Sequence, residues 1–176
     1  MKQPNELNLE LWKGKTLQEA TNHLEENLAD GVFCPCCKRF NKEYERKFNS
    51  AMAICLLEFY KTSILNSSLR DFTHIADLFL NNKLFAENMN GGNFATIAYW
   101  ELIEEMPKDH KNTTSRTSGY WRITQKGIDF VNSKIQIPKY IYTHNATLLR
   151  VSDTVTDIQQ SLGNKFNYVE MMQGEL

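Results

Sequence analysis

Three of the four cysteines in the chain stand within four positions, in the sequence CPCC from Cys34 to Cys37. Cys34 and Cys37 have the C-x2-C spacing, which lets one tight turn present two thiolates to a tetrahedral metal ion while backbone N–H groups donate to the sulfurs. Pro35 stiffens such a turn. The motif constrains the fold strongly because both thiols must lie at one corner of the chain, and it predicts half of a structural zinc site.

The other half of this site is not marked by spacing, because the sequence contains no second C-x2-C pair and no H-x3-H pair. His74 is the first choice for a remote ligand and His23 the second, although a lone histidine is more often a surface or core residue. The full set of candidates is Cys36, His23, His74, His110 and His144.

A redox role and a metal-free structural turn are the alternatives to zinc. The motif resembles the C-x-x-C of thioredoxin-type proteins, and the basic residues Lys38, Arg39 and Lys42 favour a thiolate. However, that chemistry needs a preceding strand and a βαβ context. Here the motif is predicted to lie between two amphipathic helices, so structural zinc is favoured.

The composition is that of a globular chain with a substantial core, with 176 residues of which 41% are hydrophobic and 23% charged. The first residues lack the apolar run of a secretory signal, and no stretch of eighteen apolar residues occurs. We therefore expect a cytoplasmic protein without membrane association. In that reducing compartment clustered cysteines bind metal or do redox chemistry rather than form a disulfide framework.

Apolar spacing predicts helices on both sides of the cysteine turn. Residues 16 to 31 begin with Thr16 and Glu19 in capping-box spacing and end at Gly31, which predicts a first helix. Residues 41 to 64 show a period of three to four, which predicts a long second helix in which Cys55 is a small buried residue.

The rest of the chain alternates short elements. We expect a short strand at residues 72 to 75, a short helix at 76 to 80, a third core helix from Asn93 to Pro107 and, after a polar loop, a strand at 120 to 123. A short helix, a two-strand hairpin separated by Asn145 and Ala146, and a helix at 155 to 162 follow. The fold class is mainly α with a small β component (α+β), with domains at residues 1–47, 48–135 and 136–176.

The element order over residues 48 to 124 resembles a winged helix-turn-helix. The stretch YWELIEEM resembles the end of a recognition helix, and GYWRITQKGIDFV resembles the wing strand and following turn of transcriptional regulators of the multiple-antibiotic-resistance type. This resemblance implies three helices around a shared core, capped by a hairpin. The core positions are Leu56, Phe59, Leu78, Phe94, Ile97 and Ile103.

The same resemblance implies a DNA-binding surface. In a major groove, Asn93, Thr96 and Tyr99 of the third helix reach base edges, and Asn suits adenine. Contacts to phosphates or the minor groove, which make affinity salt-dependent, fall to Lys108, Lys111, Arg116 and Arg122. Docking on a protein is the alternative, because the third helix is rich in bulky apolar and acidic residues that do not suit a phosphate-lined groove.

Charge is segregated along the chain although the net charge is only −1. Residues 107 to 150 carry eight Lys/Arg against two Asp/Glu, and residues 32 to 50 carry five against two. Residues 1 to 31 are acidic, with three Lys/Arg against six Asp/Glu. Two basic regions of this kind are able to form a phosphate-contacting surface, although a linear count does not place the charges on one face.

Most of the chain is similar to a group of uncharacterised, mostly bacteriophage-encoded proteins that join a CPxC knuckle to a winged-helix-like part. The similar stretches are CPCCKRFNKEYERKFNSAMA, SGYWRITQKGIDFV and IPKYIYTHN. The sequence has no P-loop, H-E-x-x-H or G-x-S-x-G motif. We therefore expect a non-enzymatic module that binds duplex DNA or docks on a host protein, with its oligomeric state open.

Overall fold

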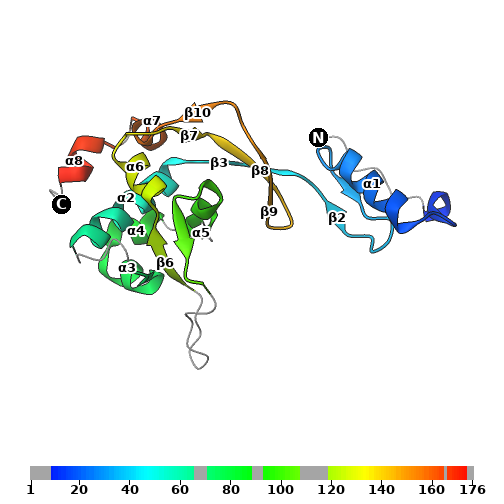
Figure 1. Cartoon of the computed structure of the whole chain (residues 1–176), viewed down its shortest axis with the longest axis horizontal. Coiled ribbons are helices and arrows are strands. Elements are labelled where there is room, and N and C mark those ends of the chain that lie inside the picture. The colour runs from blue at the N-terminus through cyan, green and yellow to red at the C-terminus, as the bar shows by residue number, and fades with distance from the viewer. Residues whose placement is uncertain (1–8, 66–70, 89–92, 108–118, 165, 174–176) are drawn as a thin grey trace, which may run out of the picture. The chain divides into compact units, whose positions relative to one another are not determined.

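The computed structural model describes residues 9–65, 71–88, 93–107, 119–164 and 166–173, and combines helices with small sheets (Figure 1). The expected mixed α+β class is therefore confirmed. The chain forms two compact units: a first unit of Met1–Arg46 with Ile141–Val151, and a second unit of Lys47–Tyr140 with Ser152–Leu176. We expected divisions at 47/48 and 135/136; the structure instead groups the predicted hairpin with the N-terminal segment and the tail with the core.

The first unit contains one α-helix and short strands. Its elements are η1 (Leu9–Trp12), α1 (Leu17–Asn27), β1 (Val32–Phe33), β2 (Phe40–Asn41) and most of β3 (Tyr44–Lys47), β8 (Tyr140–His144) and β9 (Thr147–Val151). Strands β1 and β2 pair antiparallel, and β3, β8 and β9 form a sheet in that order. Asn145 and Ala146 both have left-handed φ angles of 47° and 59°, which suit the tight turn of the predicted β8–β9 hairpin.

The capping box predicted for the first helix is confirmed. The Thr16 hydroxyl accepts a hydrogen bond from the Glu19 backbone N–H at 3.2 Å, and the Glu19 carboxylate accepts one from the Thr16 backbone N–H at 2.8 Å. The helix nevertheless buries little, since Ala20 is its one buried residue and Leu17 is 76% exposed. Capping by polar groups, more than packing, therefore fixes where α1 begins.

The capping hydrogen bonds are expected to lower the pKa of Glu19. The backbone N–H of Thr16, helped by the Lys15 ammonium, lowers this pKa to about 2. The stabilisation that Glu19 gives to folding is therefore fully present above its ordinary pKa, and it is lost as the pH falls through the folded-state value. NMR titration of the side-chain carboxyl carbon is expected to show a midpoint near pH 2. Thr16→Pro removes the main donor and should raise the midpoint, and an ordinary midpoint in the wild type would contradict the capping geometry.

The helix predicted over residues 41 to 64 begins later than expected. Its first part is strand, in β2 and β3, and α2 spans Ser50–Leu65. The side chain of Asn49 accepts a hydrogen bond from the Met52 backbone N–H at 3.0 Å, which caps the helix at this point. The aromatic spacing continues through Tyr44 and Phe48, but Tyr44 is an exposed strand residue, so spacing alone extended the prediction too far.

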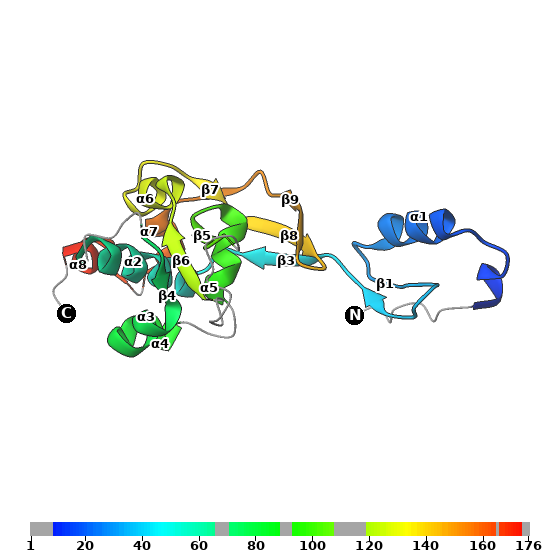
Figure 2. The same cartoon turned by 60° about the horizontal axis from the view of Figure 1, so that its bottom comes forward.

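The second unit packs around α2 (Figures 1 and 2). A sheet of order β4-β6-β5 is formed by β4 (Thr73–His74), β5 (Ile103–Glu105) and β6 (Tyr120–Ile123). Strands β7 (Ile137–Pro138) and β10 (Val155–Thr156) form a separate antiparallel pair. The helical elements around α2 are α3 (Ile75–Asn81), α4 (Lys83–Asn88), α5 (Asn93–Thr96), η2 (Ile97–Trp100), α6 (Gln125–Val131), α7 (Ile158–Leu162) and α8 (Tyr168–Gln173).

The core predicted for this region is confirmed. Helix α2 is buried on every side from Met52 to Tyr60. Edge-to-face ring contacts join Phe94 to Phe59, Phe85 and Trp121, with ring centroids 5.3, 5.4 and 5.9 Å apart. The six predicted core residues, Leu56, Phe59, Leu78, Phe94, Ile97 and Ile103, are all at most 3% exposed.

The third predicted helix is wrong in its second half. Helix α5 passes into the 3-10 helix η2, which ends at Trp100 because Glu101 has a left-handed φ of 61°. The chain then turns into β5, where Ile103 pairs with Ile123 of β6. The apolar residues that suggested one long helix are instead divided between the short helical segment and β5. Both elements bury their apolar residues in the same core, so the sequence pattern does not distinguish the two arrangements. Among the described helices, none is long and apolar enough to cross a membrane.

Candidate functional site

The cysteine motif forms the loop of the β1–β2 hairpin. The Cys34 backbone N–H donates to the Arg39 carbonyl and the Lys38 N–H donates to the Cys34 carbonyl, both at 2.8 Å. Lys38 has a left-handed φ of 61°, which closes the turn. The prediction that the motif forms a corner between two helices is therefore wrong, because strands β1 and β2 flank it. The preceding strand that a redox site needs is present, but β2 follows the motif instead of the helix of a βαβ unit.

The turn directs backbone amides at the first sulfur. Cys34 is buried, whereas Cys36 and Cys37 are exposed, and all three are free thiols. Burial raises the pKa of Cys34, but the N–H groups of Cys37 and Cys36 outweigh it and bring the pKa below its ordinary value. Desolvation and the neighbouring Cys34 raise the pKa of Cys36. Amides that donate to a sulfur are a feature of thiolate ligands, so the local geometry fits one side of a metal site.

The predicted histidine ligands have other partners. The His23 ring contacts the Trp12 ring in a tilted arrangement, with the ring centroids 4.8 Å apart. His74 belongs to the second unit, and its Nδ1 accepts a hydrogen bond from the Ala76 N–H at 3.1 Å to cap α3. His144 Nε2 lies 3.0 Å from the Asn41 side-chain oxygen, and His110 lies outside the described residues. Within the described ranges, no group of three or more His, Cys, Asp or Glu is placed to hold a metal ion.

The second candidate site is the hairpin of β5 and β6 with the helical segment before it. Three of its predicted cations, Lys108, Lys111 and Arg116, lie outside the described residues. The fourth, Arg122 of β6, donates from Nε to Glu104 Oε1 at 2.6 Å, and its guanidinium lies 4.7 Å from the centre of the Phe72 ring. This pairing holds Arg122 within the sheet.

The predicted base-contacting residues fall on one short helical segment. Asn93 begins α5, Thr96 ends it, and Tyr99 lies in η2. The spacing of three puts Thr96 and Tyr99 on the same side of the segment. Thr96 and Tyr99 are half-buried.

Several lysines of the second unit lie beside carboxylates. Nζ to carboxylate distances are 2.7 Å for Lys126 with Glu101, 3.4 Å for Lys134 with Asp129 and 2.7 Å for Lys61 with Glu58. Glu58 was not predicted as a site residue, and it is only 1% exposed although it is acidic. The available signal was one acidic residue inside the apolar run from Ala51 to Tyr60, with Lys61 three positions later.

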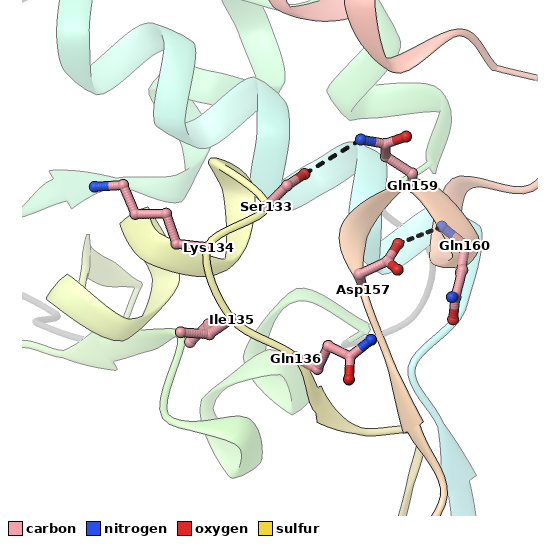
Figure 3. Close-up of a pocket in the computed structure, with 7 residues that line it drawn as sticks. All are labelled: Ser133, Lys134, Ile135, Gln136, Asp157, Gln159 and Gln160. Carbon is pink, nitrogen blue, oxygen red and sulfur yellow. Dashed lines mark hydrogen bonds between the residues drawn. The ribbon is translucent and has the colours of Figure 1, made fainter.

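A polar pocket of about 710 Å³ lies between the end of α6 and the start of α7 (Figure 3). Some of its polar groups are used locally: Gln159 Nε2 donates to Ser133 Oγ at 3.4 Å, and Asp157 Oδ1 caps α7 by accepting from the Gln160 N–H at 2.8 Å. The Lys134 side chain points away from the pocket toward Asp129. The lining residues supply no acid–base pair, and the pocket supports no catalytic assignment.

Comparison with known proteins finds no family model that matches the chain, and no similar curated protein or solved structure.

Proposed function

We propose that the protein is a non-enzymatic DNA-binding module of the winged-helix type, with a zinc knuckle in its first unit. The observation that carries the proposal is the β5–β6 hairpin, whose connecting residues 106–119 hold three cations in the sequence. The order α2, β4, α3, α4, α5, β5, β6 and the sheet order β4-β6-β5 support it, because they agree with the resemblance.

In this proposal the segment of α5 and η2 enters the major groove, and the loop between β5 and β6 contacts the backbone. Asn93, Thr96 and Tyr99 face base edges, and Lys108, Lys111 and Arg116 neutralise phosphates. Arg122 supports the hairpin through Glu104 and Phe72. Phosphate contacts release counterions, so the affinity should fall steeply with salt.

Fluorescence anisotropy with a labelled random duplex over a salt series tests this assignment. The wild type is expected to bind at low salt, and the Lys111→Ala/Arg116→Ala variant should reduce the slope of log K against log salt by about two, one for each lost phosphate contact. The matched control is Lys83→Ala/Lys134→Ala, two lysines of the same unit whose side chains are 90% and 64% exposed. The control should bind like the wild type.

Two results would overturn the DNA assignment. One is the absence of duplex binding at 50 mM salt, and the other is an equal loss of binding in both double variants, which would mean that only overall charge matters.

Docking on a host protein is the second candidate, and it rests on α3. Phe79 and Leu80 of this helix are 46% and 79% exposed, side by side in the sequence. Adjacent exposed apolar side chains are typical of protein contacts rather than of phosphate-lined grooves. The similarity to bacteriophage-type proteins suggests a host protein as the partner. This candidate takes precedence if the duplex is not bound.

The zinc knuckle is proposed at Cys34 and Cys37. The segment from η1 to β2 buries only Ala20, Cys34 and Pro35 among its described residues. A segment of this size with so small a core usually needs a metal, a disulfide or a partner chain to be stable. Two thiols at C-x2-C spacing, with amides directed at one sulfur, supply that metal ligation.

A further inference from the structure

We propose that one zinc ion joins two copies of this chain, each copy contributing Cys34 and Cys37 to a shared four-thiolate site. The inference rests on the proposed zinc knuckle and names the partner that completes it.

The cysteine turn provides too few ligands for zinc by itself. Structural zinc takes four ligands in tetrahedral geometry. The turn supplies Cys34 and Cys37, and within the described part of the chain no group of three or more donors converges. A second copy of the same turn supplies the two missing ligands without any further residue type. Two-fold symmetry makes this arrangement natural, because each copy presents the same surface to the other.

The position of the turn in the fold allows contact with a second copy. It is the tip of a two-strand hairpin, and Cys37 is exposed there. Helix α1 lies alongside the hairpin within the first unit (Figure 2). The exposed Cys37 thiol is accessible to an ion shared with another molecule, and Cys34, buried in the same turn, would complete the pair of ligands from each copy.

Among the described residues, the surface beside the turn carries apolar side chains that are exposed to solvent. A small cavity of about 120 Å³ lies against Pro35 and Cys36, with Trp12, Leu17 and Ala20 of the η1–α1 region around it. Leu17 is 76% exposed and Leu11, in η1, is 69% exposed. A second copy docked at the cysteine turn would remove this apolar surface from water, which favours association.

Charge also fits a second copy. Residues 1 to 31 have three Lys/Arg against six Asp/Glu, and residues 32 to 50 have five against two. In a symmetric pair, the acidic helix of one copy can face the basic turn of the other. The cations Lys38, Arg39 and Lys42 of both copies also offset the net negative charge of a zinc ion bound by four thiolates.

Native mass spectrometry during a zinc titration of the metal-free, reduced full-length chain tests the shared site. The expected species is two chains with one zinc ion, and its fraction should be greatest at half an equivalent of zinc per chain. A chelator should return the monomer. Cobalt titrated in place of zinc should give the visible absorption of a tetrahedral thiolate site, complete at the same half equivalent.

Cysteine variants separate the ligands from their neighbour. Cys37→Ser should abolish the zinc-linked dimer, whereas the second unit, which has its own buried core, is expected to stay folded in this variant. Cys36→Ser is the matched control and should dimerise like the wild type. Circular dichroism of both variants checks that loss of the dimer does not reflect unfolding.

The outcomes distinguish the shared site from the knuckle itself. A monomer with one tightly bound zinc per chain, lost in Cys37→Ser, would overturn the shared site and leave the proposed knuckle standing. A dimer that persists after chelation would also overturn it, because zinc would not then be the link. No zinc binding at all would overturn both proposals.

Discussion

Gly127→Ala is expected to lower the free energy of unfolding by about 2 to 3 kcal/mol, as overpacking of a filled core does. Gly127 lies buried in α6, and an added Cβ would overlap the Leu102 carbonyl oxygen and press on the Ile123 side chain. That carbonyl is fixed, because it accepts a hydrogen bond from the Thr124 N–H at 3.0 Å. The sign of this change in unfolding free energy distinguishes a packed from an exposed glycine. A Gly→Ala change within an exposed helix stabilises the protein by about 1 kcal/mol.

Chemical denaturation followed by circular dichroism measures this effect. Gly163→Ala is the control: its φ of 71° strains any side chain, but nothing lies within 4 Å of the added Cβ. The control should cost about 1 to 3 kcal/mol from backbone strain alone. If Gly127→Ala stabilised the protein, α6 would not pack on the corner before β5 as described.

Glu58→Ala is expected to lower the free energy of unfolding by about 3 kcal/mol or more, because it leaves a partly buried cation and amide without their partner. Glu58 Oε1 lies 2.7 Å from Lys61 Nζ, and Oε2 accepts from Asn82 Nδ2 at 2.6 Å. Oε1 has no well-aligned hydrogen bond, so its contact is an ion pair alone. Asn82 in turn accepts from the Phe85 N–H at 2.9 Å and so begins α4.

Two further variants test the cause. Glu58→Gln keeps a group able to accept from Asn82 but lacks the charge, so its loss should be smaller. Glu58→Leu combined with Lys61→Met removes both charges and should be more stable than Glu58→Ala, since an apolar pair replaces a broken ion pair. A Glu58→Ala protein within 0.5 kcal/mol of the wild type would contradict this account.

Local signals in the sequence predicted several elements correctly. Thr16 and Glu19 marked the start of α1 because the capping box depends on two residues at fixed spacing. The hairpin predicted over residues 137 to 151 forms between β8 and β9, because Asn145 tolerates the left-handed turn. Errors arose where helix and strand share an apolar pattern. The strand after Trp100 depends on Glu101 in a left-handed conformation, which propensity does not indicate.

The candidate site was predictable only in part for similar reasons. The C-x2-C spacing placed Cys34 and Cys37 on one turn, because that is a local constraint. The flanking strands β1 and β2 have two residues each, too few for an alternating pattern to show. His74 was a plausible ligand by residue type, but its role as a helix cap depends on φ and ψ values that the sequence does not indicate.

The two compact units are discontinuous in the chain, and this has a consequence for synthesis. The first unit includes residues 141–151 and the second includes residues 152–176, so neither is complete until these later residues have been synthesised. Helix α2 is synthesised well before its neighbours α7 and α8, which follow much later in the chain. A nascent chain stalled near residue 135 would expose the apolar surface of α2 to its surroundings. The ribosome-bound chain therefore depends on the synthesis of α7 and α8 to protect its core from aggregation.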